Sequence, residues 1–101
     1  MAERLQLQNL LEDILGSPNV YFQPPLNVQM IYPCFVYHLD DYDTKFAGNM
    51  TYRLVKRYRV TYIDKNPDSE IPEIVANLPL VSFNRFFVAD KLNHFVFNLY
   101  F

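Results

Sequence analysis

Glycine and cysteine are scarce in this sequence. The 101 residues include two glycines, Gly16 and Gly48, which excludes the glycine-rich loops that bind phosphate groups. The single cysteine, Cys34, excludes a disulfide within the chain and is typical of a reducing compartment. No run reaches the ~20 apolar residues of a membrane span, and the first residues lack the apolar core of a signal peptide. We therefore expect a soluble protein that is not exported.

The chain also lacks a strong charge of either sign. Its formal net charge is −2 at pH 7, too small to predict that the whole surface attracts nucleic acid. Aromatic residues are abundant instead, at 17% with 8 Tyr and 9 Phe. Tyrosine combines apolar area with a polar tip and is frequent at protein interfaces. We expect one domain, residues 1–101, with aromatic side chains that take part in an assembly.

Two segments have the spacing of amphipathic helices. The first is predicted over residues 2–15, with Gly16 as its C-terminal cap and Pro18 beyond. Its apolar stripe consists of Leu7, Leu10, Leu11, Ile14 and Leu15. The second is predicted from a cap at Asp68 or Ser69 to about Leu78, with a stripe of Ile71, Ile74, Val75 and Leu78.

Four segments are predicted as strands, and they are Cys34–Leu39, Val55–Ile63, Val81–Val88 and Asn93–Tyr100. A short strand at residues 20–22 is an additional possibility. Asp40, Asp41 and Asp43 are expected to end the first strand in an acidic turn, and Thr44–Leu54 to form a protruding hairpin or a mobile loop. The predicted fold is therefore α+β in the order α-β-β-α-β-β, an antiparallel sheet of about four strands with two helices on one face.

The last eight residues alternate with a period of two, which is typical of a strand with one buried face. Phe95, Phe97, Leu99 and Phe101 lie on one side, which we expect to pack under the helices. The opposite side, with His94, Val96, Asn98 and Tyr100, is the expected contact surface.

No residues are spaced as catalytic or metal-binding groups usually are. His38 follows Cys34 by four residues on a predicted strand, but this pair and the three aspartates match no metal-ligand motif. The serines lack a nucleophile-elbow sequence. We expect no catalytic, cofactor-binding or metal-binding residues, and a protein that is not an enzyme.

Four of the nine Lys and Arg residues lie within seven positions at the start of the second predicted strand and just before it, and they are Arg53, Lys56, Arg57 and Arg59. With Tyr52 and Tyr58 between them they could contact nucleic acid, or they could form a solvated strand face. We favour ion pairing with the acidic turn, either within the subunit or between subunits. The candidate subunit-interface residues are Asp40, Asp41, Asp43, Arg53, Lys56, Arg57, Arg59 and Tyr100.

Four segments resemble small tail-terminator (tail-completion) and minor structural proteins of long-tailed bacteriophages and prophages. They are residues 40–47 (DDYDTKFA), 57–64 (RYRVTYID), 66–72 (NPDSEIP) and 83–101 (FNRFFVADKLNHFVFNLYF). The resemblance implies a structural virion protein that forms a ring, usually a hexamer, at the head-proximal end of the tail tube. Such a ring ends tube growth and contacts the tail-tube protein and the head–tail connector or stopper protein. It needs no cofactor, it meets DNA only as the DNA passes through its lumen, and it is assembled in the host cytoplasm.

Two alternatives remain beside this interpretation. The first is another ring component of the neck, such as a head-closure protein. The second, from a different class, is a small ligand-binding or regulatory α+β domain, because helices packed on a sheet can frame a pocket.

Overall fold

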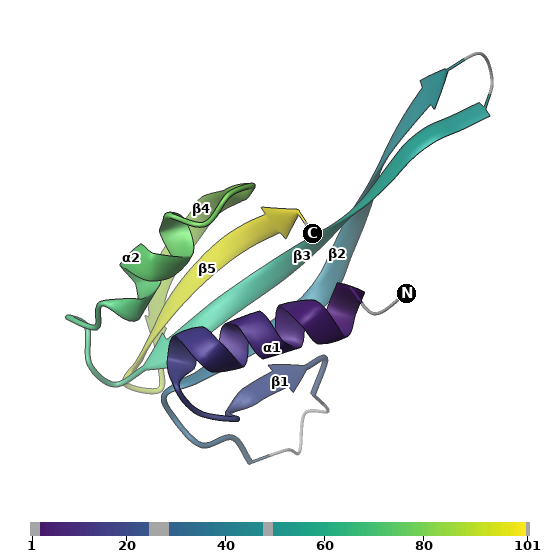
Figure 1. Ribbon diagram of the computed structural model, residues 1–101. Helices are drawn as coiled ribbons and strands as arrows, with labels where there is room; N and C mark the ends of the chain where they lie inside the picture. The colour runs from purple at the N-terminus through teal and green to yellow at the C-terminus, as the bar shows by residue number, and fades with distance from the viewer. Residues whose placement is uncertain (1–2, 25–28, 48–49, 101) are drawn as a thin grey trace.

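The computed structural model describes residues 3–24, 29–47 and 50–100, and the side chains of residues 41–55 lie outside this description. Over the described residues the chain forms two helices and five strands (Figure 1). In chain order they are α1 (Glu3–Leu15), β1 (Val20–Phe22), β2 (Cys34–Ala47), β3 (Met50–Asp64), α2 (Ile71–Ala76), β4 (Val81–Ala89) and β5 (Leu92–Tyr100).

The strands form one mixed sheet in the order β1-β2-β3-β5-β4. The α+β class and the two helices agree with the sequence prediction, but the four-stranded antiparallel sheet is wrong. The additional strand is β1, the short strand that the sequence analysis gave as a possibility at residues 20–22. It pairs in parallel with Phe35–Tyr37 of β2, whereas the other described pairs are antiparallel. Three residues are too few for a periodic signal, so tertiary pairing decides whether such a segment joins the sheet.

Helix α1 follows its predicted stripe. Leu7 and Leu11 are fully buried, whereas Ile14 and Leu15 pack partly buried at the margin of the core. The helix ends at Gly16, whose φ of +72° is a conformation that glycine adopts without steric cost. The N–H groups of Gly16 and Ser17 both donate to the carbonyl oxygen of Glu12, at 2.8 and 3.3 Å, which is the usual closure of a helix before an αL residue.

Helix α2 is shorter than predicted, because it ends at Ala76 with Asn77 as its C-cap. Ser69 lies one residue before the N-cap, and its hydroxyl accepts the N–H of Ile71 at 3.3 Å. Val75 is buried, but Ile74 is 46% exposed, so the predicted stripe is wrong at Ile74. Successive helical residues point about 100° apart. A helix of two turns above an edge strand therefore buries only the side that carries Val75, and the neighbouring Ile74 stays exposed.

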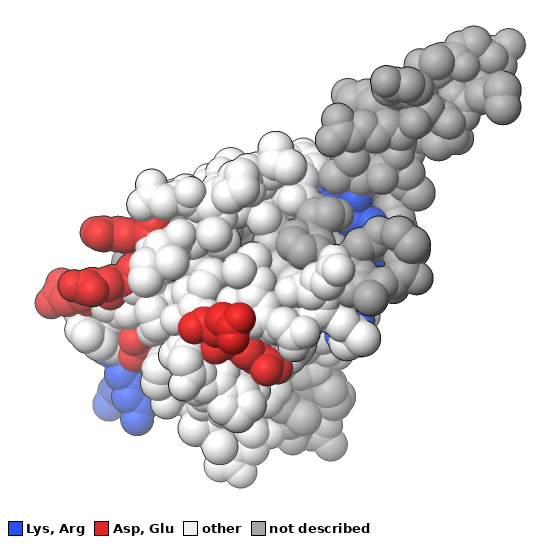
Figure 2. Space-filling view, viewed as in Figure 1, with Lys and Arg blue, Asp and Glu red and all other residues white. Residues whose placement is uncertain are grey.

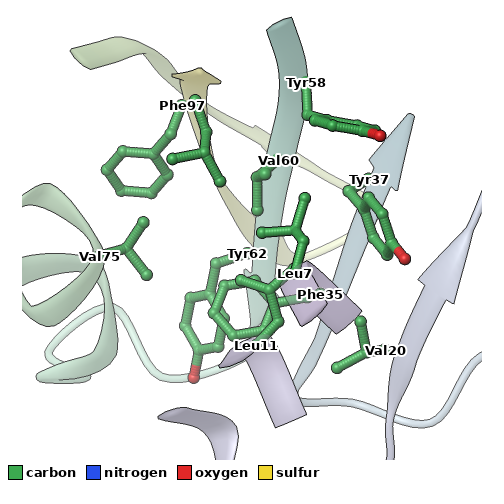
Figure 3. Close-up of a cluster of buried hydrophobic side chains, with 11 residues drawn as sticks. Leu7, Leu11, Val20, Phe35, Tyr37, Tyr58, Val60, Tyr62, Val75 and Phe97 are labelled. Carbon is green, nitrogen blue, oxygen red and sulfur yellow. The ribbon is translucent and has the colours of Figure 1, made fainter. Parts of the chain in front are cut away.

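The main core lies between the helices and one face of the sheet (Figure 3). Side chains from α1 and α2 meet alternate residues of the strands, which point to the same face because a strand has a period of two. Its fully buried members include Leu7, Leu11, Val75, Phe35, Tyr37, Val60, Tyr62 and Phe97. A smaller cluster of Cys34, Ile63 and Leu92 occupies the other face.

The C-terminal strand has the predicted parity. Phe95, Phe97 and Leu99 pack in the main core, and Phe101 lies outside the described residues. On the opposite side Val96 is 3% exposed, so it belongs to the buried part of the subunit. β5 pairs with β3 and β4 along its length, which places this strand inside the sheet.

The predicted acidic turn at residues 40–43 is wrong, because β2 continues to Ala47. Hydrogen bonding to β3 keeps the aspartates in a strand despite their low strand propensity. Asp41–Ala47 of β2 and Met50–Lys56 of β3 pair with each other and with no other described strand. This two-stranded segment, here called the ribbon, projects beyond the helices (Figure 1). The backbone thus agrees with the protruding-hairpin alternative for residues 44–54, except at residues 48–49, which lie outside the description.

We predict that Leu99→Ala destabilises the protein by about 2–5 kcal/mol, because Leu99 is 3% exposed and packs in the main core. Urea unfolding of the purified chain measures this change. Leu5→Ala on α1 is the matched control, since Leu5 is 53% exposed and its truncation should cost less than about 0.5 kcal/mol. Equal losses in the two variants would show that β5 is not docked in the core.

Candidate functional site

Four of the candidate interface residues meet on the sheet face opposite the helices. Asp40 lies at a register shift between Leu39 and Asp41, where β2 has one residue more than β3. Its Oδ2 accepts hydrogen bonds from Nε of Arg57 at 2.9 Å and lies 2.8 Å from Nη2 of the same guanidinium. Nη2 of Arg59 lies 3.6 Å from the same oxygen. A bulge thus directs one carboxylate toward two arginines of the neighbouring strand.

Tyr100 completes this cluster from β5, where it lies directly opposite Arg57. A hydrogen bond with the Tyr100 hydroxyl and the charge of Asp40 raise the pKa of Arg57, against a smaller opposing effect of burial. Within the described residues, Nε of Arg59 is buried and has no hydrogen-bond partner. The cluster therefore carries two guanidinium groups for one described carboxylate, whose side chain is 17% exposed.

The remaining candidate interface residues are only partly described. The side chains of Asp41, Asp43 and Arg53 lie outside the described residues, and their backbone positions are opposite Arg57, Val55 and Lys45 respectively. Lys56 is half-buried. Of the two arrangements that we considered for ion pairing, the structure shows the one within the subunit for Asp40 with Arg57 and Arg59. An interface role for all eight residues stays a prediction.

The larger unpartnered surface among the described residues is the edge strand β4, which the sequence analysis did not select as an interface. It pairs with β5 on one side and with no described strand on the other. Phe83 is 54% exposed, Phe86 46% and Val88 60%, and Leu80 just before the strand is 64% exposed. Figure 2 shows that the helix side of the molecule is mostly uncharged over the described residues, with acidic side chains in two groups.

The direction of the β4 backbone follows from its pairing with β5. The N–H of Tyr100 donates to the carbonyl of Leu80 at 3.0 Å, so every second residue from this point directs its backbone groups toward β5. Beyond the register shift between Phe83 and Arg85, the residues whose backbone N–H and C=O groups point toward β5 are Arg85, Phe87 and Ala89. The residues whose N–H and C=O groups point away from β5 are therefore Val81, Phe83, Phe86 and Val88. These are the same residues whose side chains lie on the helix side.

The opposite face of β4 is exposed as well, but there Phe87, which is 37% exposed, contacts two polar side chains. The ring of Phe87 stacks on His94, with centroids 4.5 Å apart and an interplanar angle of 11°. The guanidinium carbon of Arg85 lies 5.1 Å from the centroid of Phe87. This stack places polar groups against Phe87, whereas Phe83 and Phe86 on the helix side contact the apolar rings of Phe97 and Phe95.

The sequence contained one signal for this exposed edge. Between Val81 and Val88 apolar residues occur at both parities, because the extra residue at the Phe83–Arg85 register shift breaks the alternation. A strand with aromatic residues on both sides fits a buried strand and an assembly edge equally well. The sequence does not distinguish the two.

The groups considered for chemistry lie apart in the structure. Cys34 is fully buried, and burial, with the nearby Asp64 charge, raises its pKa to about 12, so its thiol is protonated at neutral pH. Among the described residues no three His, Cys, Asp or Glu side chains are grouped as metal ligands. In that same part of the chain, neither helix is long and apolar enough to cross a membrane.

No protein-family model matches this chain, and no curated protein or solved structure matches it at a significant level. The functional proposal therefore depends on the residues and geometry described above together with the resemblance of the four segments.

We predict that the free energy of unfolding falls as the pH rises above about 9. Burial raises the pKa of Cys34 from 9.0 to about 12. Burial, with the Asp64 hydrogen bond, likewise raises the pKa of Tyr62 from 10.0 to about 12. The unfolded chain therefore loses these protons first, so the stabilisation is fully present below pH 9 and is lost between about 9 and 12. Urea unfolding at about pH 8 and pH 11 measures the fall, which should be smaller in Cys34→Ala and in Tyr62→Phe. An equal fall in all three chains would contradict it.

We also predict that Asp40 and Arg57 stabilise the fold as a coupled pair. Asp40→Asn and Arg57→Gln should each lower the unfolding midpoint, and the double variant should lose less than their sum. The coupling should shrink at about 1 M salt, where screening acts over ~3 Å. Asp40→Asn with Lys56→Gln is the control pair and should be additive. Additivity in both pairs would contradict the coupling.

Proposed function

We propose that this chain is a structural virion protein of the phage tail–neck junction, which forms a ring that terminates the tail tube and joins it to the head-side connector. The ring is a homo-oligomer, most simply a hexamer, and acts by contact rather than by catalysis. Its partners are further copies of itself, the tail-tube protein and the connector or stopper protein. The protein resides at the head-proximal end of the tail, after assembly in the host cytoplasm.

The observation that carries this proposal is the open edge of the sheet. A nine-residue edge strand with exposed Phe83, Phe86 and Val88 is a liability in a monomer, because it invites pairing with other chains. Monomeric proteins usually protect such an edge with charges, proline or a covering loop. The exposed apolar residues of the β4 edge therefore support a protein that assembles with other chains.

A second feature supports a ring over a symmetric dimer. A ring made by head-to-tail contacts needs two different surfaces on each subunit. The β4 edge is one such surface. The ribbon is another, because it extends from the body of the subunit (Figure 1) and gives the molecule a long dimension of 50 Å against 25 and 23 Å for the others.

The resemblance to tail-terminator proteins supports the proposed position of the ring in the virion. Two of the four resembling segments, residues 40–47 and 83–101, fall on the two surfaces named above, the ribbon and the β4–β5 hairpin. In the second of these segments the exposed residues Phe83, Phe86 and Val88 belong to β4, whereas Phe97 and Leu99 of β5 are buried in the core.

We predict that the purified chain, alone or with the tail-tube protein of the same virion, forms an oligomer of about 72 kDa, six copies of a 12.0 kDa chain. Size-exclusion chromatography with light scattering measures the mass, and electron microscopy measures tube length. Added protein should stop tube elongation at one end. A chain that stays at 12.0 kDa and leaves tube growth unchanged would contradict the proposal, and a ring that ignores the tube would favour the head-closure alternative.

A further inference from the structure

We infer that in the assembly β4 of one copy pairs with the ribbon of the next copy, so that the sheet continues from subunit to subunit. This inference rests on the proposed function and deepens it by naming the two surfaces that join. The occupant of the β4 edge is thus a second copy of this chain.

The exposed side of β4 requires a strand as its occupant. Val81, Phe83, Phe86 and Val88 direct their N–H and C=O groups outward, and an added strand satisfies such a row of groups. β4 contains no proline or lysine, residues that commonly block edge pairing. Its one cation, Arg85, belongs to the opposite face, where it lies over Phe87. Nothing in β4 itself therefore opposes the approach of another strand.

The ribbon supplies strands that lack a second neighbour. Along Asp41–Ala47 and Met50–Lys56 each strand pairs with the other and with no further strand among the described residues. A two-stranded hairpin is at best marginally stable in water, and a third strand is what usually makes it stable. Seven residues span about 23 Å and the nine residues of β4 about 30 Å, so the two edges match in length.

The ribbon does not meet β4 of its own subunit. In the sheet order, β5 separates β3 from β4, and the ribbon leads away from that part of the sheet (Figure 1). Pairing of the two edges is therefore intermolecular. It is also head-to-tail, since each copy offers β4 to one neighbour and the ribbon to the other. Repetition of such a contact closes a ring when the rotation between successive copies divides a full turn evenly.

Cysteine cross-linking between two variants tests this pairing. One chain carries Phe83→Cys, at an exposed position of β4. The second carries one cysteine in the ribbon, placed at neighbouring positions of each strand so that both faces are sampled: Thr44→Cys, Lys45→Cys, Thr51→Cys or Tyr52→Cys. The native Cys34 is fully buried, so the unaltered chain is the control and should form no dimer. After mixing, reassembly and oxidation, a dimer of about 24 kDa, twice the chain mass, is measured on a denaturing gel without reductant.

The outcomes separate the possible occupants. A dimer in mixtures of a β4 variant with a ribbon variant, and not in either alone, is expected. A dimer from Phe83→Cys alone shows that β4 pairs with itself and overturns the inference. Rings that stop tube growth but give no dimer in any mixture overturn the inference and leave the proposed function intact. Dimers of the expected kind without any effect on the tube overturn the function and leave the pairing intact.

A backbone variant gives a second readout. The N–H of Val88 points away from β5, so Val88→Pro removes a donor from the outer edge and leaves the β4–β5 pairing in place. Subunit association should weaken at least about tenfold, because proline blocks an edge strand. Val88→Thr keeps the N–H and is the matched control. Equal unfolding midpoints confirm that both fold, and equally tight association of the two variants would overturn the inference.

Discussion

The alternation of side chains along β3 is the constraint on which the rest of the structure depends. Tyr58, Val60 and Tyr62 are at most 2% exposed and face the helices, whereas Arg57 and Arg59 face the opposite side. β3 lies between β2 and β5, so its register sets the register of both neighbours. A slip of one residue would bury two guanidinium groups and expose the tyrosines, which neither helix could accommodate. The main core and the charged cluster are therefore two consequences of one register.

Tyrosine hydroxyls then fix the helices and their connections to this sheet. The Tyr37 hydroxyl donates to Oε1 of Gln8 at 2.6 Å, and Nε2 of the same glutamine donates to the carbonyl of Val20 at 3.1 Å. The Tyr62 hydroxyl donates to Asp64 at 2.7 Å and lies 3.1 Å from Ser69, whose oxygen also accepts the first N–H of α2. Each ring fills the core while its polar tip meets a defined partner at the margin. Such directional contacts orient helices that apolar packing alone would hold less specifically.

The core of the subunit is well packed, but the strands at its periphery keep exposed edges. At one edge of the sheet the outermost strand, β1, has only three residues. At the other edge, Arg85 and His94 contact Phe87 on one face of β4. The outer side of β4 and both sides of the ribbon receive no comparable cover from the described residues. Exposed aromatic side chains next to unpaired backbone groups are characteristic of surfaces that become buried on association. The proposed ring would satisfy these groups without any change in the subunit core.

The sequence by itself determined the elements whose signals are local. The stripe of Leu7 and Leu11 with Gly16 predicted α1, and the parity of Phe95, Phe97 and Leu99 predicted the buried face of β5. Both predictions use only the hydrophobic period of a segment and the residues at its ends, which do not depend on the rest of the chain. Hydrogen bonding between strands distant in sequence decided the rest. It kept Asp40 and Asp41 in a strand where composition predicted a turn, and it placed Asp40 beside Arg57 within one subunit. It also put β4 at the edge, which the sequence could not reveal because apolar residues at both parities fit a buried strand and an open one equally well.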